Sequence, residues 1–206
     1  AGILPQETEG TGERTVAVVV NPTKIGDMGD LKAVVEQAAA DAGYSATRWY
    51  GTTPDDPGAG QTRAALAEGP AVVIAAGGDG TVRAVAGQLA GTDIPLGILP
   101  LGTGNLLARN LNLPLGSSLS NLAMVALTGR LQRIDVGRIG APEPTEGELA
   151  QIADMGPDAR PFAGCEPFLV IAGMGFDADV MNDADHGLKH AMGWGAYLVS
   201  GFKFMR

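Results

Sequence analysis

Short strand-like runs alternate with helical patterns along the first 130 residues, and this alternation constrains the fold more than any other feature of the sequence. The strand-like runs are "RTVAVVVNP", "YSATRWYGTT", "AVVIAA" and "IPLGILPLG". They are too apolar for a half-exposed sheet, in which apolar and polar residues would alternate. Such strands, each followed by a helix, predict an α/β fold in which helices cover both faces of a parallel sheet.

The helical patterns are expected over residues 31–42, 61–69, 81–90 and 118–129. In the first of them, Asp30 is placed to cap the start and Gly43 to end it. After Gly129 the pattern changes. Residues 131–139 are strand-like, 140–166 are typical of a Pro-, Gly- and acid-rich surface loop or a partly disordered insertion, and 168–172 predict a strand that enters a glycine turn.

We therefore expect two domains with a boundary near residue 130. The first is an α/β domain over residues 14–129. The second, over residues 130–206, is an incomplete, mainly β domain that carries a flexible acidic insertion near 140–166. No internal repeat is evident in the sequence.

The net charge of −9 is unevenly distributed along the chain. Residues 1–13 and 143–158 hold eight of the 23 acidic residues and no Lys or Arg, so the remainder is near neutral. The sequence lacks the basic stripe that nucleic-acid binding requires, and it predicts no strong electrostatic attraction to an anionic bilayer. It contains no apolar run of membrane-spanning length and no signal-peptide pattern at its start. The lone Cys165 fits a reducing cytoplasm.

Four loops follow the carboxyl ends of the expected strands, where open parallel sheets bind ligands. They are "NPTKIGD", "GTTPDDPG", "GGDGTVR" and "PLGTGNLLAR". The last two combine glycines with a threonine, which lets backbone N–H groups and a helix N-terminus converge on an anion. Two such loops on neighbouring strands predict a polyphosphate site. Neither loop is a P-loop, so positive charge would come from Lys24, Arg83 or Arg109.

An aspartate, Asp79, stands inside the first glycine loop. A carboxylate repels phosphate, so Asp79 should act on a metal, a water or an attacking hydroxyl. The plain alternative is that it merely caps the helix that follows. For one such loop in isolation both interpretations stay open, and the presence of a second glycine loop favours the chemical one.

Three features of the last 40 residues carry weaker signals. Residues 173–178 fit the dinucleotide fingerprint G-x-G-x-x-A, but the acidic residue expected about twenty positions later is missing. A structural turn or a lipid-side loop is therefore favoured there. His186 and His190 have a metal-like spacing without an evident third ligand, which favours a surface helix turn. Aromatic residues from Trp194 to Phe204 favour core packing over a lipid-facing surface.

Several of these stretches together resemble the diacylglycerol kinase catalytic-domain family, the bacterial lipid kinases related to sphingosine kinases. The stretches "VVVNPT", "GGDGTVRAVAGQL", "PLGILPLGTGNLLARNLNLP" and "AGMGFDADV" appear in the family's order, and the resemblance extends from about residue 14 to residue 206. "GGDGT" alone is also similar to the more distant NAD kinases, whereas "LPLGTGNLLARNL" is far more specific to the lipid kinases.

The resemblance implies that ATP binds with Mg²⁺ between an α/β nucleotide-binding domain and an all-β domain. It implies a nucleotide-binding set drawn from the four loops: Asn21, Thr52, Thr53, Gly77, Gly78, Asp79, Gly80, Thr81, Val82, Arg83, Gly102, Thr103, Gly104 and Asn105. The family often has Asn at the position of Arg83 and an acidic residue at that of Leu106, so the charge beside the phosphates differs in this chain.

The implied reaction is transfer of the γ-phosphoryl group of ATP to a hydroxyl of diacylglycerol or a similar lipid, with Asp79 as the catalytic residue that orients or deprotonates the acceptor. Relatives carry a Gly-Asp-Gly-Glu-like acidic motif further along, and nothing similar precedes Arg206. We therefore expect a truncated chain or one that is incomplete for catalysis by itself. If the missing carboxylate is the base, Asp79 is instead a ligand of metal-bound water.

Two alternatives remain: an NAD kinase-like enzyme, and an inactive nucleotide-binding module. The expected partners are ATP and a lipid reached by transient peripheral contact with a membrane, with no nucleic acid, and a homodimer is left open. The expected location is the cytoplasm, with peripheral association at the membrane.

Overall fold

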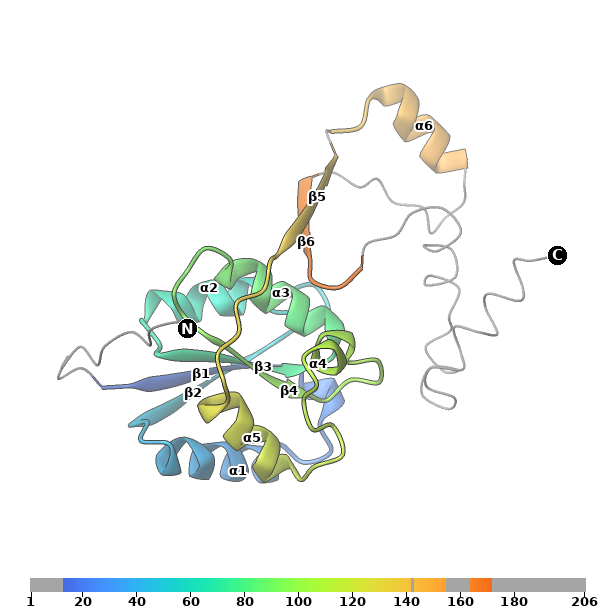
Figure 1. The fold of residues 1–206 in the computed structure, drawn as a ribbon. Helices are drawn as coiled ribbons and strands as arrows, with labels where there is room; N and C mark the ends of the chain where they lie inside the picture. Colours follow the sequence, from blue (N-terminus) through green and yellow to red (C-terminus); the bar gives the residue numbers. More distant parts are fainter. Residues whose placement is uncertain (1–12, 142, 155–163, 172–206) are drawn as a thin grey trace.

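A computed structural model describes residues 13–141, 143–154 and 164–171 of the chain (Figure 1). The expectations for the glycine turn at 173–178, the two histidines and the aromatic segment near the C-terminus lie outside these residues.

The first part of the chain is a parallel sheet wrapped by helices, as the alternating pattern predicts. Four strands pair in the order β2-β1-β3-β4, and every pairing is parallel. The elements are β1 (Thr15–Val20), the 3-10 turn η1 (Pro22–Lys24), α1 (Met28–Asp41), β2 (Ala46–Gly51), α2 (Ala59–Ala67), β3 (Val72–Gly77), α3 (Asp79–Leu89), β4 (Leu96–Pro100), α4 (Leu106–Asn110) and α5 (Leu119–Thr128). The α/β fold class is confirmed.

The two faces of the sheet bury separate sets of side chains. Val16, Val18 and Val20 of β1 pack against α1 and α5, whereas the alternate residues Ala17 and Val19 pack against α2, α3 and α4. Figure 1 shows α1 and α5 below the sheet and α2 and α3 above it. All six residues of β1 are buried, so the strand needs apolar side chains on both faces of the sheet. This explains why its sequence is a continuous apolar run and does not alternate with polar residues.

The start of α1 differs from the prediction. The N-cap is Asp27, not Asp30: its Oδ1 accepts hydrogen bonds from the backbone N–H groups of Gly29 at 2.7 Å and Asp30 at 3.1 Å. Asp27 has the extended backbone that an N-cap needs, while Asp30 lies in the first helical turn. The predicted end is correct, since Gly43 follows the helix with a φ of +79°.

The second part of the described chain is a two-stranded antiparallel ribbon with one helix. The ribbon consists of β5 (Gly137–Ala141) and β6 (Gly164–Phe168), and α6 (Glu146–Asp154) lies between them in sequence. The strand expected over 131–139 forms only from Gly137 onward, and β6 ends at Phe168, where a strand was expected to begin. The expected loop over 140–166 contains α6 instead.

Helix α6 begins with a capping box that the sequence analysis missed. The backbone N–H and hydroxyl of Thr145 donate to the Glu148 carboxylate at 2.8 Å and 2.7 Å. These hydrogen bonds hold the pKa of Glu148 below its usual range. The signal is present in the sequence as Thr-x-x-Glu ahead of Leu149, but the surrounding Pro, Gly and acidic residues favoured a loop.

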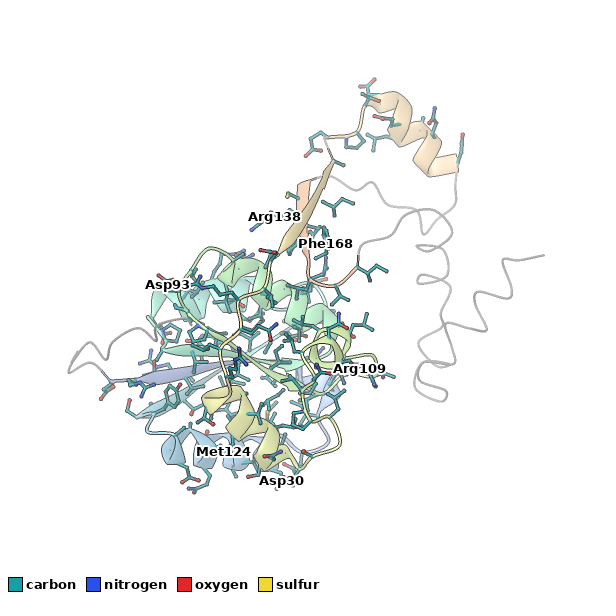
Figure 2. The ribbon with its side chains drawn as sticks, viewed as in Figure 1. Asp30, Asp93, Arg109, Met124, Arg138 and Phe168 are labelled. Carbon is teal, nitrogen blue, oxygen red and sulfur yellow. The ribbon has the colours of Figure 1, made fainter. Side chains whose placement is uncertain are left out.

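The ribbon, together with Leu169 directly after it, docks on α3. Gly87 of α3 faces the ring of Pro167, and Leu169 packs against the cluster formed by α2, α3 and α4. Arg83 pairs with Glu166 at 3.1 Å, and Arg138 donates to the carbonyl of Gly87 at 3.4 Å. Figure 2 shows Arg138 and Phe168 on this ribbon. The division into domains at residue 130 stays a prediction.

Candidate functional site

The four loops singled out in the sequence lie side by side at the carboxyl edge of the sheet. Backbone hydrogen bonds join them just beyond the strands: Asn21 donates to Ala76 at 2.9 Å, Thr52 to Val20 at 2.8 Å, and Leu101 to Gly77 at 2.9 Å. The chain reverses its direction across the sheet between β1 and β3, since β2 is added on one side of β1 and β3 on the other. Ligands of open parallel sheets bind at such switch points.

The two glycine loops touch each other backbone to backbone. A Cβ atom added at Gly102 would lie 2.5 Å from the Cα of Gly78, closer than side chains tolerate. Gly102 therefore requires glycine, although its φ is not positive. A Cβ at Gly78 would lie 3.5 Å from the Cα of Gly102, which is an ordinary contact. The sequence predicts two loops that act together, and the structure brings them into direct contact.

Asp79 ties the two glycine loops together. Its Oδ2 accepts a hydrogen bond from the backbone N–H of Asn105 at 2.8 Å, and its Oδ1 accepts one from Leu106 at 2.6 Å. These donors belong to the start of α4, whose own N-cap residue makes no side-chain cap. A Cβ at Gly104 would lie 2.8 Å from Oδ2 of Asp79. Asp79 thus caps a helix, but that helix is α4, not the one it begins.

Asn105 holds the second glycine loop in a closed turn. Its Oδ1 accepts from the N–H of Gly102 at 3.1 Å, while its Nδ2 donates to the carbonyl of Gly102 at 2.7 Å. Its backbone is left-handed, with a φ of 50°, a conformation that asparagine tolerates better than most residues. The side-chain amide of this predicted nucleotide-binding residue therefore shapes the loop.

The two threonines of the glycine loops differ in exposure. Thr81 is 3% exposed, and its side chain fills the space beside Gly77 where a Cβ would otherwise stand. Thr103, in the second loop, is exposed. Val82 is buried in the core between α3 and the sheet, whereas Gly80 is exposed and has open space in place of a Cβ.

The loops after β1 and β2 are held by their own side chains. Oδ1 of Asn21 accepts from the N–H of Thr23 at 3.0 Å and from its hydroxyl at 2.8 Å. Thr52 is buried, and the hydroxyl of Thr53 accepts from the N–H of Asp56 at 3.1 Å. The side-chain bonds of Asn21 and Thr53 therefore shape these two predicted loops.

Asp56 organises the loop before α2, and the sequence analysis did not select it. Its carboxylate accepts hydrogen bonds from the N–H groups of Gly58 at 3.1 Å and Gly60 at 3.0 Å. Desolvation acts to raise the pKa of Asp56. The effect is outweighed by these two hydrogen bonds, by a third from the backbone of Ala59 and by the positive charge of Arg63, so the pKa lies below its usual range. An aspartate two residues before a glycine N-cap is the signal that could have identified it.

Two of the three predicted sources of positive charge, Arg83 and Arg109, have partners within the chain. Arg83 pairs with Glu166, and the Nε of Arg109 donates to the carbonyl of Gly104 at 2.8 Å. Arg109 therefore lies on α4 beside the second glycine loop (Figure 2). Lys24 is exposed at the end of η1.

A pocket of about 90 Å³ opens beside Asp79, between α3, α4 and the segment that follows β6. Asp79 and Arg83 are the charged residues among its described lining. The other lining residues are apolar: Val82, Leu106, Leu107, Phe168, Leu169, Val170 and Ile171. The sequence analysis did not select the ribbon residues of this group, because only the docking of the ribbon on α3 brings them to Asp79.

Within the described parts of the chain, no group of three or more His, Cys, Asp or Glu side chains is placed to hold a metal ion. Over the same residues, no helix is both long enough and apolar enough to cross a membrane.

The sequence matches the diacylglycerol kinase catalytic domain over residues 15–139. The chain belongs to this family. The match covers the whole parallel sheet and both glycine loops and ends within β5. The residues that form the junction at Asp79 are therefore those of a diacylglycerol kinase catalytic domain.

Named relatives agree with this assignment. The chain is 42% identical over 96 residues to a diacylglycerol kinase of Mycobacterium tuberculosis strain H37Rv, a match that covers 47% of this chain and 31% of that protein. It is 36% identical over 143 residues to a protein of Chromohalobacter salexigens named probable lipid kinase YegS-like, covering 68% of this chain and 38% of that protein. The matches cover between 26% and 39% of the length of the curated relatives.

Among solved structures, a diacylglycerol kinase from Bacillus anthracis strain Sterne has a similar fold. The TM-score is 0.50 at 21% sequence identity, over 72% of this chain and 55% of that one. This likeness concerns the fold alone, and it agrees with the parallel sheet and the small antiparallel ribbon.

Proposed function

We propose that the chain is the nucleotide-binding part of an ATP-dependent lipid kinase, which transfers the γ-phosphoryl group of ATP to a hydroxyl of diacylglycerol or a similar lipid. The observation that carries the proposal is the position of Asp79. Its carboxylate lies at the junction of two glycine loops and also lines an apolar pocket. Phosphoryl transfer depends mainly on positioning and on neutralising charge, and this junction supports both.

The start of α3 would receive the phosphates of ATP. The first N–H groups of an α-helix have no intrahelical partner, and Gly78, at the N-cap of α3, makes no side-chain cap. The space beside Gly80 is open. The residues present therefore fit an anion at this helix N-terminus. The exposed hydroxyl of Thr103, and Asn21, Thr52 and Thr53 on the neighbouring loops, would complete the nucleotide set.

Mg²⁺, as in other kinases, would neutralise charge on the phosphates while bound mainly by phosphate oxygens and waters. If another carboxylate is the base, Asp79 would instead hold the metal through a water. The remaining lone pairs of Asp79 support this role, because each oxygen accepts one bond from α4 and a carboxylate has about four acceptor sites.

The acceptor hydroxyl would approach Asp79 from the apolar pocket. A lone pair of the carboxylate would accept the hydrogen of this hydroxyl and so direct the oxygen at the γ-phosphorus. As the new O–P bond forms, the bond from the γ-phosphorus to the β,γ-bridging oxygen breaks and ADP departs. The hydroxyl proton passes to Asp79 or, through water, to solvent.

The proposed partners follow from this reaction. They are ATP and a lipid acceptor, reached through transient contact with a membrane surface from the cytoplasm, and nucleic acid has no part in it. A homodimer is an open alternative to a monomer.

The test is transfer of labelled phosphate from ATP, in Mg²⁺, by the full natural chain that contains these residues. Mixed micelles would offer diacylglycerol, sphingosine and phosphatidylglycerol, with NAD in solution. Transfer to a lipid, abolished by Asp79→Asn, is the expected result. Transfer to NAD alone would establish an NAD kinase-like enzyme instead. ATP binding without transfer to any acceptor would establish an inactive nucleotide-binding module.

A further inference from the structure

The pocket beside Asp79 contains a second charged side chain, Arg83, whose charge is already matched. Asp79 and Arg83 are four residues apart on α3, so both lie on the helix face that lines the pocket. Nη1 of Arg83 lies 3.1 Å from Oε2 of Glu166, which stands on β6. The described lining is otherwise apolar.

The position of Glu166 is fixed by the docking of the ribbon. Its neighbour Pro167 sits over Gly87, one turn along α3 from Arg83, and the partly buried Leu169 packs against the core on the same side of the sheet. Glu166 therefore meets Arg83, a lining residue of the pocket, because α3 and the ribbon are joined there.

We infer that Glu166, by neutralising Arg83, sets the charge of the acceptor: the pocket takes a lipid whose hydroxyl end is uncharged and disfavours one with an anionic phosphodiester beside the hydroxyl. Because Glu166 pairs with Arg83, the described lining offers no free cation that would bind an anionic headgroup. Without Glu166, the free guanidinium would attract it, since arginine binds phosphate in a bidentate manner. This inference rests on the proposed lipid kinase activity.

The size and exposure of the pocket agree with this role. A volume of about 90 Å³ is enough for the hydroxyl end of a lipid. The side chains of Arg83 and Glu166 are 44% and 50% exposed, so their bond contributes little to stability. A change in either residue should therefore alter the charge at the pocket while leaving the fold intact.

The experiment measures the ratio of phosphate transfer to phosphatidylglycerol over diacylglycerol. Both offer a primary hydroxyl, and only the first carries a phosphodiester. Micelles would contain a constant total of anionic lipid, supplied by phosphatidylserine, so that surface charge stays equal. The proteins are the full natural chain and its variants Glu166→Gln, Arg83→Gln and the double variant.

The wild-type chain should prefer diacylglycerol. Glu166→Gln should raise the ratio about fivefold, as expected for one exposed charge interaction, and Arg83→Gln should lower it. The double variant should return near the wild-type ratio, and all differences should shrink in high salt. Glu68→Gln is the matched control, because Glu68 forms an exposed pair with Arg48 and lies outside the pocket lining; it should leave the ratio unchanged.

A wild-type preference for phosphatidylglycerol would overturn the inference and leave the lipid kinase standing. The inference would also be overturned if Glu166→Gln and Arg83→Gln moved the phosphatidylglycerol-to-diacylglycerol ratio in the same direction, or if both left it within twofold of the wild-type value. If wild type transfers phosphate to no lipid, the proposed function fails and the inference fails with it.

Discussion

The carboxylate oxygen Oδ1 of Asp79 accepts a hydrogen bond from the backbone N–H of Leu106 at 2.6 Å, across 27 positions of sequence. Its other oxygen accepts from Asn105 at 2.8 Å. One side chain therefore joins the loop after β3 to the helix after β4. Asp79 therefore caps α4 in addition to the chemical role proposed for it.

Asp79→Asn should weaken both the fold and the transfer reaction. An amide offers one acceptor oxygen, so one of the two bonds to α4 is lost, at a cost of about 1–2 kcal/mol in the free energy of unfolding. The reaction should be abolished if Asp79 also orients the acceptor. Urea unfolding and labelled-phosphate transfer measure the two effects.

Asp27→Asn is the matched control for that substitution. Asp27 also caps a helix through two backbone N–H groups, but both donate to its Oδ1. Asparagine retains such an oxygen and is an equally good N-cap, so the free energy of unfolding and the reaction should stay near wild type. Asp79→Asn with wild-type transfer would remove Asp79 from the chemistry and leave it as a cap.

Gly102→Ala should separate the glycine loops. The added Cβ would lie 2.5 Å from the backbone of Gly78, so the loops must move apart. We expect a loss of about 1–3 kcal/mol in the free energy of unfolding, as for other overpacked sites. Binding of ATP, followed by calorimetry, should weaken with it.

Gly80→Ala should weaken ATP binding without weakening the fold. No atom lies within 4 Å of the added Cβ, and alanine is the better helix former, so the free energy of unfolding should hold or rise. If phosphate occupies that open space, ATP affinity should still fall. Gly116→Ala, also with open space, is the control that should change neither the affinity nor the fold. Undiminished ATP affinity in Gly80→Ala would place the phosphates elsewhere.

The sheet could be predicted from sequence because its strands carry their own burial pattern. β1 is buried at all six positions, and its run of valines and alanine in the sequence therefore predicts a central strand. The glycine loops could also be recognised in the sequence, and at Gly102 glycine is required by the close approach of the Gly78 backbone. Their contact with each other follows once the strand order is known.

The bonds within the site could not be predicted in this way. The carboxylate of Asp79 reaches donors 26 and 27 residues later, and local sequence does not specify such a contact. The pocket could not be predicted because it forms only where the ribbon docks on α3. That docking depends on the contact between Gly87 and Pro167, about 80 residues apart in sequence. Helix α6 was not predicted for another reason. Its capping box is a local sequence signal, but the Pro-, Gly- and acid-rich composition around it favoured a loop.

Gly87→Ala should displace the ribbon from α3. The new Cβ would lie 2.5 Å from Cγ of Pro167, so β6 has to shift. Backbone amides of β6 should exchange hydrogen faster, and the pocket beside Asp79 should lose its ribbon wall. Gly147→Ala, in α6 with open space around it, is the control and should leave exchange in β6 unchanged. Unchanged exchange in Gly87→Ala would show that the docking tolerates a methyl group there.

The capping bonds of Asp56 should make stability depend on pH. Its folded pKa lies below the 3.8 of an ordinary aspartate, so the folded chain binds fewer protons at Asp56 than the unfolded chain does in that range. Stability from Asp56 is therefore fully present above about pH 5 and declines as pH falls through 3.8 toward the folded pKa. The free energy of unfolding of wild type and Asp56→Asn, measured from pH 6 to pH 3, should differ most at pH 6 and converge in acid. Asp55→Asn, which leaves the bonds to Gly58 and Gly60 intact, should follow the wild-type pH dependence. A constant difference between wild type and Asp56→Asn across this range would mean that the ionised form of Asp56 is not what holds the loop before α2.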